Sequence, residues 1–352
     1  MHELVIPVEV DDVTPAWLSE ALDADVTAVE VVDRHSGTTG RARLALTYGD
    51  ETSLPTSVFV KLAPFDDRQR RFVDLVGLGI AEARFYRDVA ADVPVRIPAV
   101  LHASLDDDGR YVMVLEDLVG SGCTFPSPHD EDIADVTGRI VDELAILHAR
   151  FWDAPELSDG LEWVSEGNRL AFGGGGPFIQ RAVDRFADEM PPAFRRLGEL
   201  YVNETPRIAD LYETAPHTLA HGDPHLGNLF VDRGRPGFYD WGMVMRRAGM
   251  WDVAYVVCNG LPPEIRRTHE REWIDRYRAG LAGQGLPLDA ETAWEQYRLF
   301  AVYAWSSATS TAGVGSRWQP EAYGRQGMEA ATTAVDDLDS IELLESLLGS
   351  RS

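Results

Sequence analysis

The first third of the chain alternates apolar and polar residues in short runs, which is the pattern of half-buried β-strands. Glycine, proline and acidic residues separate these runs, as is typical of turns. One longer segment, residues 67–89, carries its apolar residues at helical spacing instead. The pattern predicts a small five-stranded antiparallel sheet with one main helix. The predicted strands span residues 26–32, 42–48, 57–63, 97–103 and 111–115.

The rest of the chain is predicted to be mostly helical, because its apolar residues recur every three or four positions. Acids and a glycine in Glu116-Asp117-Leu118-Val119-Gly120 interrupt the apolar run before this pattern begins. We therefore expect an α+β fold with an N-terminal lobe over residues 1–117 and a larger C-terminal lobe over residues 118–352. The predicted helices include residues 130–152, 177–189, 192–213, 263–281, 290–310 and, with breaks, 321–348.

Composition and charge narrow the class of protein. The 352 residues are 45% hydrophobic and 26% charged, with a net charge of -26, as in acidic globular proteins. Such a charge argues against nucleic-acid and anionic-membrane partners. Two cysteines provide no disulfide framework. We expect no signal peptide and no spanning helix, and hence a cytoplasmic protein; the oligomeric state is left open.

The strongest chemical motif is the stretch His221-Gly222-Asp223-Pro224-His225-Leu226-Gly227-Asn228, which is followed by Asp240. It matches H-x-D-x-x-x-x-N followed by D-x-G, the pattern that kinases use for phosphoryl transfer. In that pattern the first acid handles the acceptor hydroxyl, which makes Asp223 the candidate base. The amide and the second acid hold magnesium, so Asn228 and Asp240 are the candidate metal ligands.

Lys61 is the only lysine in the chain. It lies in the predicted strand 57–63, and Glu82 follows in the predicted helix. A lysine is a compact point charge suited to phosphate oxygens, and a nearby carboxylate orients it. The turn Ser36-Gly37-Thr38-Thr39-Gly40 joins the first two predicted strands, 26–32 and 42–48, and is interpreted either as a phosphate-covering loop or as an ordinary turn.

Two other functions remain open at this stage. His221, Asp223 and His225 have the spacing of metal ligands, so a metal-dependent hydrolase is an alternative. A catalytically silent, pseudokinase-like ATP-binding module is the other alternative, although such modules usually lack the base, a metal ligand or the lysine.

Several motifs together resemble the aminoglycoside phosphotransferase and choline-kinase-like families, and in particular their ecdysteroid-kinase-like branch. The similarity runs from about residue 30 to residue 285. Its pieces are Leu219 to Asp240, Glu82-Ala83-Arg84-Phe85-Tyr86, Val114-Leu115-Glu116-Asp117-Leu118, Leu147 to Trp152, and Asp252-Val253-Ala254-Tyr255.

This resemblance implies a bilobal protein-kinase-like fold and an ATP- and Mg²⁺-dependent phosphotransferase that acts on a hydroxyl of a small molecule, such as an antibiotic, a sugar, an amino alcohol or another metabolite. It implies that ATP binds between the lobes.

The sequence also departs from the protein-kinase pattern. The turn Ser36–Gly40 differs from the protein-kinase G-x-G-x-x-G, and no A-P-E segment follows Asp240, which disfavours a protein substrate. Asp252 is interpreted as a structural acid. The implied nucleotide-binding residues are Ser36, Gly37, Thr38, Thr39, Gly40, Lys61, Glu82, Glu116 and Leu118.

Overall fold

The computed structural model describes residues 4–37, 39–66, 69–71, 77–166, 176–314 and 321–350. These residues form two compact units. The first comprises Met1–Thr124 together with Phe230–Met243, and the second comprises Phe125–Leu229 together with Val244–Ser352.

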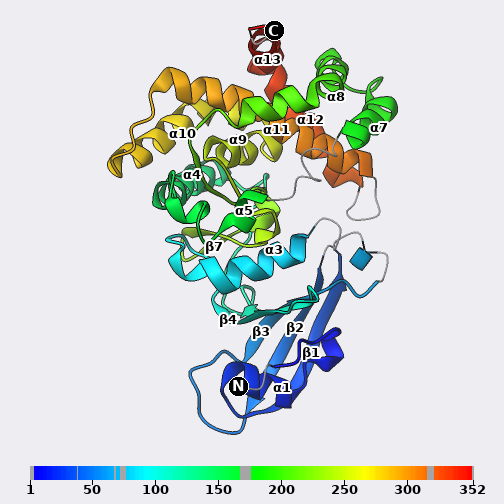
Figure 1. Cartoon of the computed structure of the whole chain (residues 1–352), viewed down its shortest axis with the longest axis vertical. Coiled ribbons are helices and arrows are strands. Elements are labelled where there is room, and N and C mark those ends of the chain that lie inside the picture. Colours follow the sequence, from blue (N-terminus) through cyan, green and yellow to red (C-terminus); the bar gives the residue numbers. More distant parts are fainter. Residues whose placement is uncertain are drawn as a thin grey trace. The chain divides into compact units, whose positions relative to one another are not determined.

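The first unit is built on a five-stranded sheet, and every neighbouring pair of strands in it is antiparallel (Figure 1). The predicted sheet is therefore confirmed, with β4 beginning three residues later than expected. On β2 the buried residues alternate with half-buried ones, whereas β5 is buried almost throughout, as expected for a strand covered on both faces. In spatial order the strands are β1 (Val26–Ser36), β2 (Gly40–Tyr48), β3 (Ser57–Leu62), β5 (Tyr111–Glu116) and β4 (Val100–Leu105).

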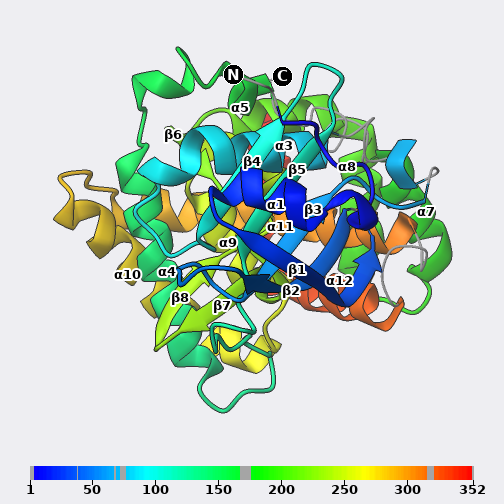
Figure 2. The same ribbon diagram turned by 90° about the horizontal axis from the view of Figure 1, so that it is seen from below.

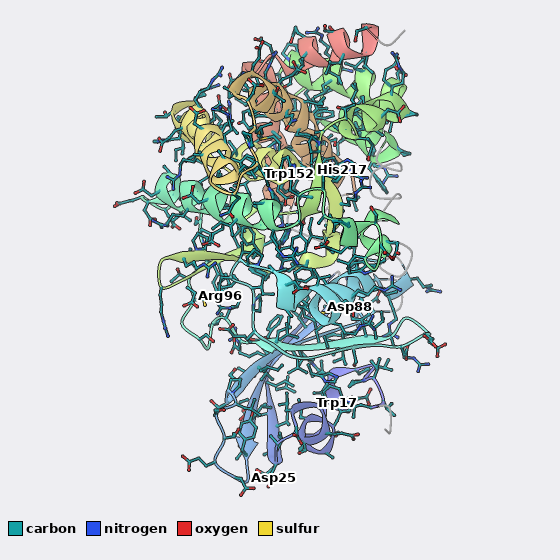
Figure 3. The ribbon with its side chains drawn as sticks, turned by 60° about the vertical axis from the view of Figure 1, so that its left-hand side comes forward. Trp17, Asp25, Asp88, Arg96, Trp152 and His217 are labelled. Atoms are coloured by element: carbon teal, nitrogen blue, oxygen red, sulfur yellow. The ribbon has the colours of Figure 1, made fainter. Side chains whose placement is uncertain are left out.

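Helix α1 (Pro15–Leu22) covers one part of this sheet (Figure 2). It follows η1 (Val10–Asp12) and begins at a Thr14 cap, whose hydroxyl accepts a 3.2 Å hydrogen bond from the Trp17 backbone N–H. The Trp17 ring, labelled in Figure 3, packs edge-on against His102 of β4, with 5.5 Å between the ring centroids. Its burial joins α1 to the apolar residues of the sheet.

The main helix of this unit is described from α3 (Leu78–Arg84) onward and continues through a π-helical turn, η2 (Phe85–Val89), into η3 (Ala90–Asp92). This part agrees with the predicted helix; residues 67–68 and 72–76 of that prediction lie outside the described residues. Gly79 lets α3 approach the sheet closely, since a Cβ there would lie 2.0 Å from the hydroxyl of Tyr111 on β5.

The second unit is mostly helical, as predicted. Large aromatic side chains fill its interior; the Trp251 ring of α9, for example, stacks on Tyr303 of α11 with 3.5 Å between centroids. None of the described helices is both long and apolar enough to cross a bilayer. The helices are α4 (Ile133–Arg150), η4 (Pro155–Leu157), α5 (Glu162–Glu166), α7 (Gly176–Phe186), α8 (Pro192–Tyr212), α9 (Met250–Asn259), α10 (Pro263–Gly283), α11 (Ala290–Val314), α12 (Glu321–Asp337) and α13 (Ser340–Gly349).

Two short two-stranded sheets flank the motif residues. One pairs β6 (His217–Ala220) with β9 (Met245–Ala248), and the other pairs β7 (Leu229–Asp232) with β8 (Arg235–Phe238). The sequence Met-Arg-Arg-Ala of β9 has no apolar alternation, so the pattern did not predict it. Single-turn helices, η5 (Leu226–Asn228) and η6 (Trp241–Met243), follow the loops that hold Asp223 and Asp240.

Candidate active site

Lys61 and Glu82 form a buried ion pair in the first unit. The Lys61 ammonium lies 2.6 Å from one Glu82 carboxylate oxygen and 2.5 Å from the other, and the side chains are only 4% and 1% exposed. Burial raises the pKa of Glu82 to about 7, although the Lys61 charge opposes this rise. Strand β3 and helix α3 thus fix the ammonium, as the sequence predicted for this pair.

Asp240 joins the same cluster. Its carboxylate oxygen lies 3.2 Å from the Lys61 ammonium, and the side chain is 30% exposed. Asp240 has a backbone φ of 63°, a conformation that non-glycine residues adopt only when their surroundings hold them there. The next residue provides such a hold, because the Trp241 ring stacks flat on Phe85, with centroids 4.0 Å apart and planes at 8°.

The turn before β2 is tied to the chain that follows β3. The Ser36 hydroxyl accepts a 3.0 Å hydrogen bond from the Phe65 N–H. A Cβ on Gly40 would lie 2.4 Å from the Phe65 ring and 2.5 Å from the Ala63 carbonyl, so only glycine fits. Among the described residues the buried Thr39 hydroxyl has no hydrogen-bond partner, and Gly37 N–H donates to the Thr39 carbonyl. Thr38 lies outside the described residues.

Arg41 is a cation near this turn that belongs to none of the sequence motifs. It is the β2 residue directly opposite Lys61 in the sheet register, and its charge lowers the pKa of Glu82. A Cβ on Gly37 would lie 3.1 Å from its guanidinium. The hairpin register, if read from the strand alternation, would have placed Arg41 beside Lys61.

The segment predicted to meet adenine is held by local contacts. The Glu116 carboxylate accepts bonds of 2.7 and 2.8 Å from the Arg96 guanidinium, labelled in Figure 3. Desolvation alone would raise the pKa of Glu116, but the hydrogen bonds from Arg96, the Ala99 N–H and Ser121, together with the Arg96 charge, lower it overall. The Leu118 carbonyl accepts a 2.9 Å bond from the Cys123 N–H, and the Leu118 side chain packs with Cys123, Phe230 and Tyr239.

In the second unit, Asp223 and Asn228 lie together at the end of β6. Gly222 precedes them at a φ of 86°, where a side chain would be strained. The Asn228 amide nitrogen donates to the Asp223 carbonyl at 2.9 Å and to its carboxylate at 3.2 Å. This arrangement leaves the carboxylate 30% exposed and holds it in one orientation.

Asp252 anchors this loop from helix α9. It is fully buried and accepts backbone hydrogen bonds from His221 at 2.6 Å and from Gly222 at 2.9 Å. The buried His148 ring lies 3.2 Å from the same carboxylate and 2.9 Å from the Tyr277 hydroxyl. The structural role expected for Asp252 is therefore observed.

Tyr255 is a neighbour of Asp223 that the sequence did not reveal. Its hydroxyl donates a 2.5 Å hydrogen bond to the Asp223 carboxylate and lies 3.1 Å from the Ser307 hydroxyl. Burial, followed by the Asp223 charge, raises the pKa of Tyr255 well above its usual value. The only available signal was its position three residues after Asp252, which places both residues on the same face of α9.

The two histidines of the motif shape the loop. The His225 ring nitrogen accepts a 3.0 Å bond from the Gly227 N–H, and the His221 ring accepts one of 3.3 Å from the Asp223 N–H. Within the described parts of the chain, no three His, Cys, Asp or Glu side chains are grouped as a metal site. His221, Asp223 and His225 therefore do not form the three-ligand centre that the hydrolase alternative required.

Residues 35–300 match the family model described as "Phosphotransferase enzyme family". The match spans most of the chain and includes both clusters described above. The chain belongs to this phosphotransferase family. Among curated proteins, no sequence matches it.

Solved structures similar to this phosphotransferase share its protein-kinase-like fold at low sequence identity. The choline kinase from Cryptosporidium parvum Iowa II is 10% identical, with a TM-score of 0.53 over 96% of this chain and 94% of that one. Plasmodium vivax ethanolamine kinase is 12% identical, with a TM-score of 0.50 over 88% and 81%. A GDP and kanamycin complex of APH(2")-IIia is 14% identical, with a TM-score of 0.52 over 90% and 95%.

Proposed function

We propose that this phosphotransferase is an ATP-dependent kinase that phosphorylates a hydroxyl group of a small molecule. The observation that carries the proposal is the buried cluster of Lys61 with Glu82 and Asp240. An ammonium that is desolvated and held between two carboxylates is costly to bury. A fixed ammonium of this kind is suited to binding phosphate oxygens.

The nucleotide-binding residues are proposed to extend around this cluster. Ser36, Gly37, Thr38, Thr39 and Gly40 would cover the phosphates, and the buried Thr39 hydroxyl, which has no hydrogen-bond partner among the residues that the structure describes, supports this role. The backbone near Glu116 and Leu118 would meet the adenine, beside the apolar cluster around Phe230. The GDP complex of a structural relative supports a nucleoside-phosphate ligand.

The donor set fits Mg²⁺, which prefers carboxylate and amide oxygens. Asn228 uses its amide nitrogen for Asp223, which leaves its carbonyl oxygen as a ligand. Asp240 offers a carboxylate that solvent reaches. When bound, the ion would neutralise charge on the phosphate oxygens.

Asp223 is proposed to act as the base. An acceptor hydroxyl must lose its proton as its oxygen bonds to phosphorus, and a positioned carboxylate can accept that proton. Asn228 and Tyr255 both donate hydrogen bonds to the Asp223 carboxylate. These bonds fix its orientation toward the acceptor, which is the main contribution a protein makes to phosphoryl transfer.

The cellular setting is proposed from charge and cysteine chemistry. Both cysteines are buried free thiols, which fits a cytoplasmic enzyme. A net charge of -26 fits a small-molecule acceptor and not a nucleic acid or an anionic membrane.

A panel of hydroxylated acceptors at fixed Mg-ATP, coupled to ADP release, tests this function. We expect ADP release that depends on one class of acceptor, and a phosphorylated product of matching mass. Thermal stabilisation by Mg-ATP without transfer to any acceptor would contradict the proposal and would favour a nucleotide-binding module without catalysis.

A further inference from the structure

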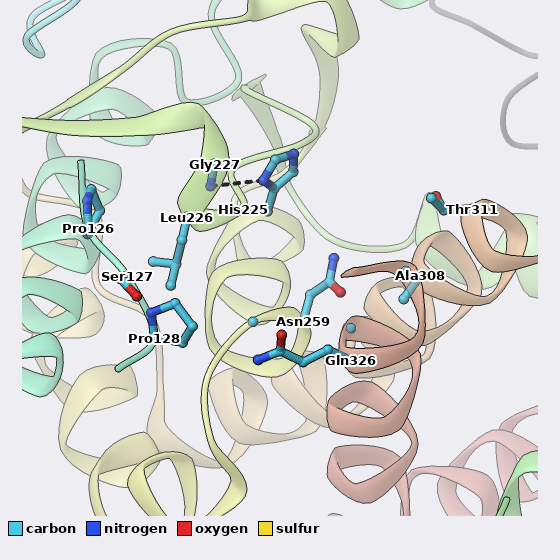
Figure 4. A pocket seen from close by; sticks show the side chains of 13 residues that line it. Pro126, Ser127, Pro128, His225, Leu226, Gly227, Asn259, Ala308, Thr311 and Gln326 are labelled. Carbon is cyan, nitrogen blue, oxygen red and sulfur yellow. Dashed lines mark hydrogen bonds between the residues drawn. The ribbon is translucent and has the colours of Figure 1, made fainter. Parts of the chain in front are cut away.

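A cavity of about 250 Å³ lies in the second unit beside the loop that carries Asp223 (Figure 4). His225 and Leu226 of that loop form one wall. Ala308 and Thr311 of α11 form a second wall, and Gln326 of α12 also lines the cavity. The volume is below the roughly 300–1,000 Å³ of sites for drug-sized ligands, so a ligand of monosaccharide size suits it.

Two sets of contacts connect this cavity to the candidate base. The His225 ring, which lines it, lies 3.6 Å from the Asp223 carboxylate. On the other side, Tyr255 links Asp223 to Ser307, and Ala308 follows directly on α11. A hydroxyl group bound in the cavity near His225 would therefore lie close to the carboxylate.

The lining has an unusual charge composition for so acidic a protein. Among the described residues that line the cavity, none is Asp, Glu, Lys or Arg, and none is Phe, Tyr or Trp. An acceptor with several amino groups would need carboxylates to offset its desolvation. A quaternary ammonium would need an aromatic cage, and an acidic acceptor would need a guanidinium.

The lining instead offers neutral hydrogen-bonding groups on an apolar surface. The side-chain amides of Asn259 and Gln326 both face the cavity in Figure 4. A Cβ on Gly327 would lie 2.9 Å from the Asn259 amide oxygen, so this glycine lets α12 approach that amide. Pro128 and Leu226 contribute apolar surface. Amides can both donate to and accept from hydroxyl groups, which satisfies a buried polyol without charge.

We propose that this cavity binds the phosphate acceptor and that the acceptor is an uncharged, polyhydroxylated compound such as a neutral glycoside. The inference rests on the proposed function and specifies its substrate class. In the reaction, the acceptor oxygen bonds to the γ-phosphorus of ATP as its proton passes to Asp223. The bond from that phosphorus to the bridging oxygen breaks, and its electron pair leaves on ADP.

Binding of matched probes without nucleotide tests the substrate class separately from catalysis. The probes are methyl glucoside, its 2-amino analogue and methyl glucuronide, which differ in charge, with myo-inositol as a second neutral probe. Calorimetry on the wild-type chain should show a neutral probe binding about tenfold more tightly than either charged one. Tighter binding of a charged probe, or saturable binding of neither neutral probe, would overturn the proposal.

Gln326→Glu provides the second arm, because it adds one carboxylate to the cavity at nearly constant shape. We expect it to shift the preference toward the amino probe by about tenfold. Gln284→Glu, an exposed change after α10 that does not line the cavity, is the matched control and should leave the preference unchanged. An unchanged preference in Gln326→Glu would overturn the proposal. A chain that prefers neutral probes but transfers no phosphate would contradict the proposed function alone.

Discussion

The Tyr255 hydroxyl donates a 2.5 Å hydrogen bond to the carboxylate of Asp223. A hydrogen bond to a charged group contributes about 1.5–3 kcal/mol. If this bond holds the base in its working orientation, Tyr255→Phe should lower kcat by about 10- to 100-fold and leave the KM for ATP unchanged. Steady-state kinetics with ATP and the acceptor measure both constants.

Tyr297→Phe is the control for this substitution. Tyr297 is also buried and donates a 2.9 Å bond to Glu270, away from Asp223. The Tyr297→Phe substitution should lower the free energy of unfolding without a matching loss of kcat. Equal effects of the two substitutions on kcat would show that the Tyr255 bond has no specific role.

Glu82 should make folding stability depend on pH. Burial raises its pKa from 4.5 to about 7. Between these two pH values, the folded chain therefore binds more protons than the unfolded chain. The free energy of unfolding must then fall as pH rises from about 4.5 to 7. Across this range, the free energy of unfolding of wild type should fall by up to about 3 kcal/mol relative to that of Glu82→Gln. Denaturant unfolding of both proteins at pH 5 and pH 7.5 measures this change. A difference in unfolding free energy between the two proteins that is the same at both pH values would contradict the prediction.

Asp252 should be needed for both stability and activity, because it accepts two backbone hydrogen bonds in a fully buried place. Asn at this position keeps one acceptor oxygen but turns an NH₂ group toward an N–H donor. We expect Asp252→Asn to lower the free energy of unfolding by about 2–4 kcal/mol and to lower kcat. Denaturant titration and kinetics at a temperature where the variant is folded test this, and wild-type values of both would refute the anchoring role.

The turn Ser36–Gly40 offers a matched pair of glycine substitutions. A Cβ at Gly40 meets the Phe65 ring and the Ala63 carbonyl at 2.4 and 2.5 Å, whereas at Gly37 it meets only flexible side chains, the nearest at 3.1 Å. Gly40→Ala must therefore displace the turn, and we expect the KM for ATP to rise about tenfold. Gly37→Ala should change it little. A similar KM for both variants would argue against a phosphate-covering role for the turn.

The sequence predicted the features that depend on local pattern or on a single unusual residue. Strand alternation predicted the sheet, and the unique Lys61 with the later Glu82 predicted their ion pair. Tyr255 was missed because its contact with Asp223 depends on packing between distant segments. Arg41 was missed because no motif contains it, although the register of β2 against β3 places it opposite Lys61. The neutral cavity was equally hidden, since it is formed by α11, α12 and the loop at His225. The lobe boundary at residues 117 and 118 stays a prediction.

The most direct test of the central claim is the rate of phosphoryl transfer from Mg-ATP by Asp223→Asn, measured with an acceptor that wild type phosphorylates. Asp275→Asn, which alters an exposed carboxylate of α10 that accepts a hydrogen bond from Arg278, is the control. Loss of a general base should lower kcat of Asp223→Asn by about 10²–10⁴-fold, while the control stays within about threefold of wild type, the scale of a surface substitution. A wild-type kcat in Asp223→Asn would contradict the account.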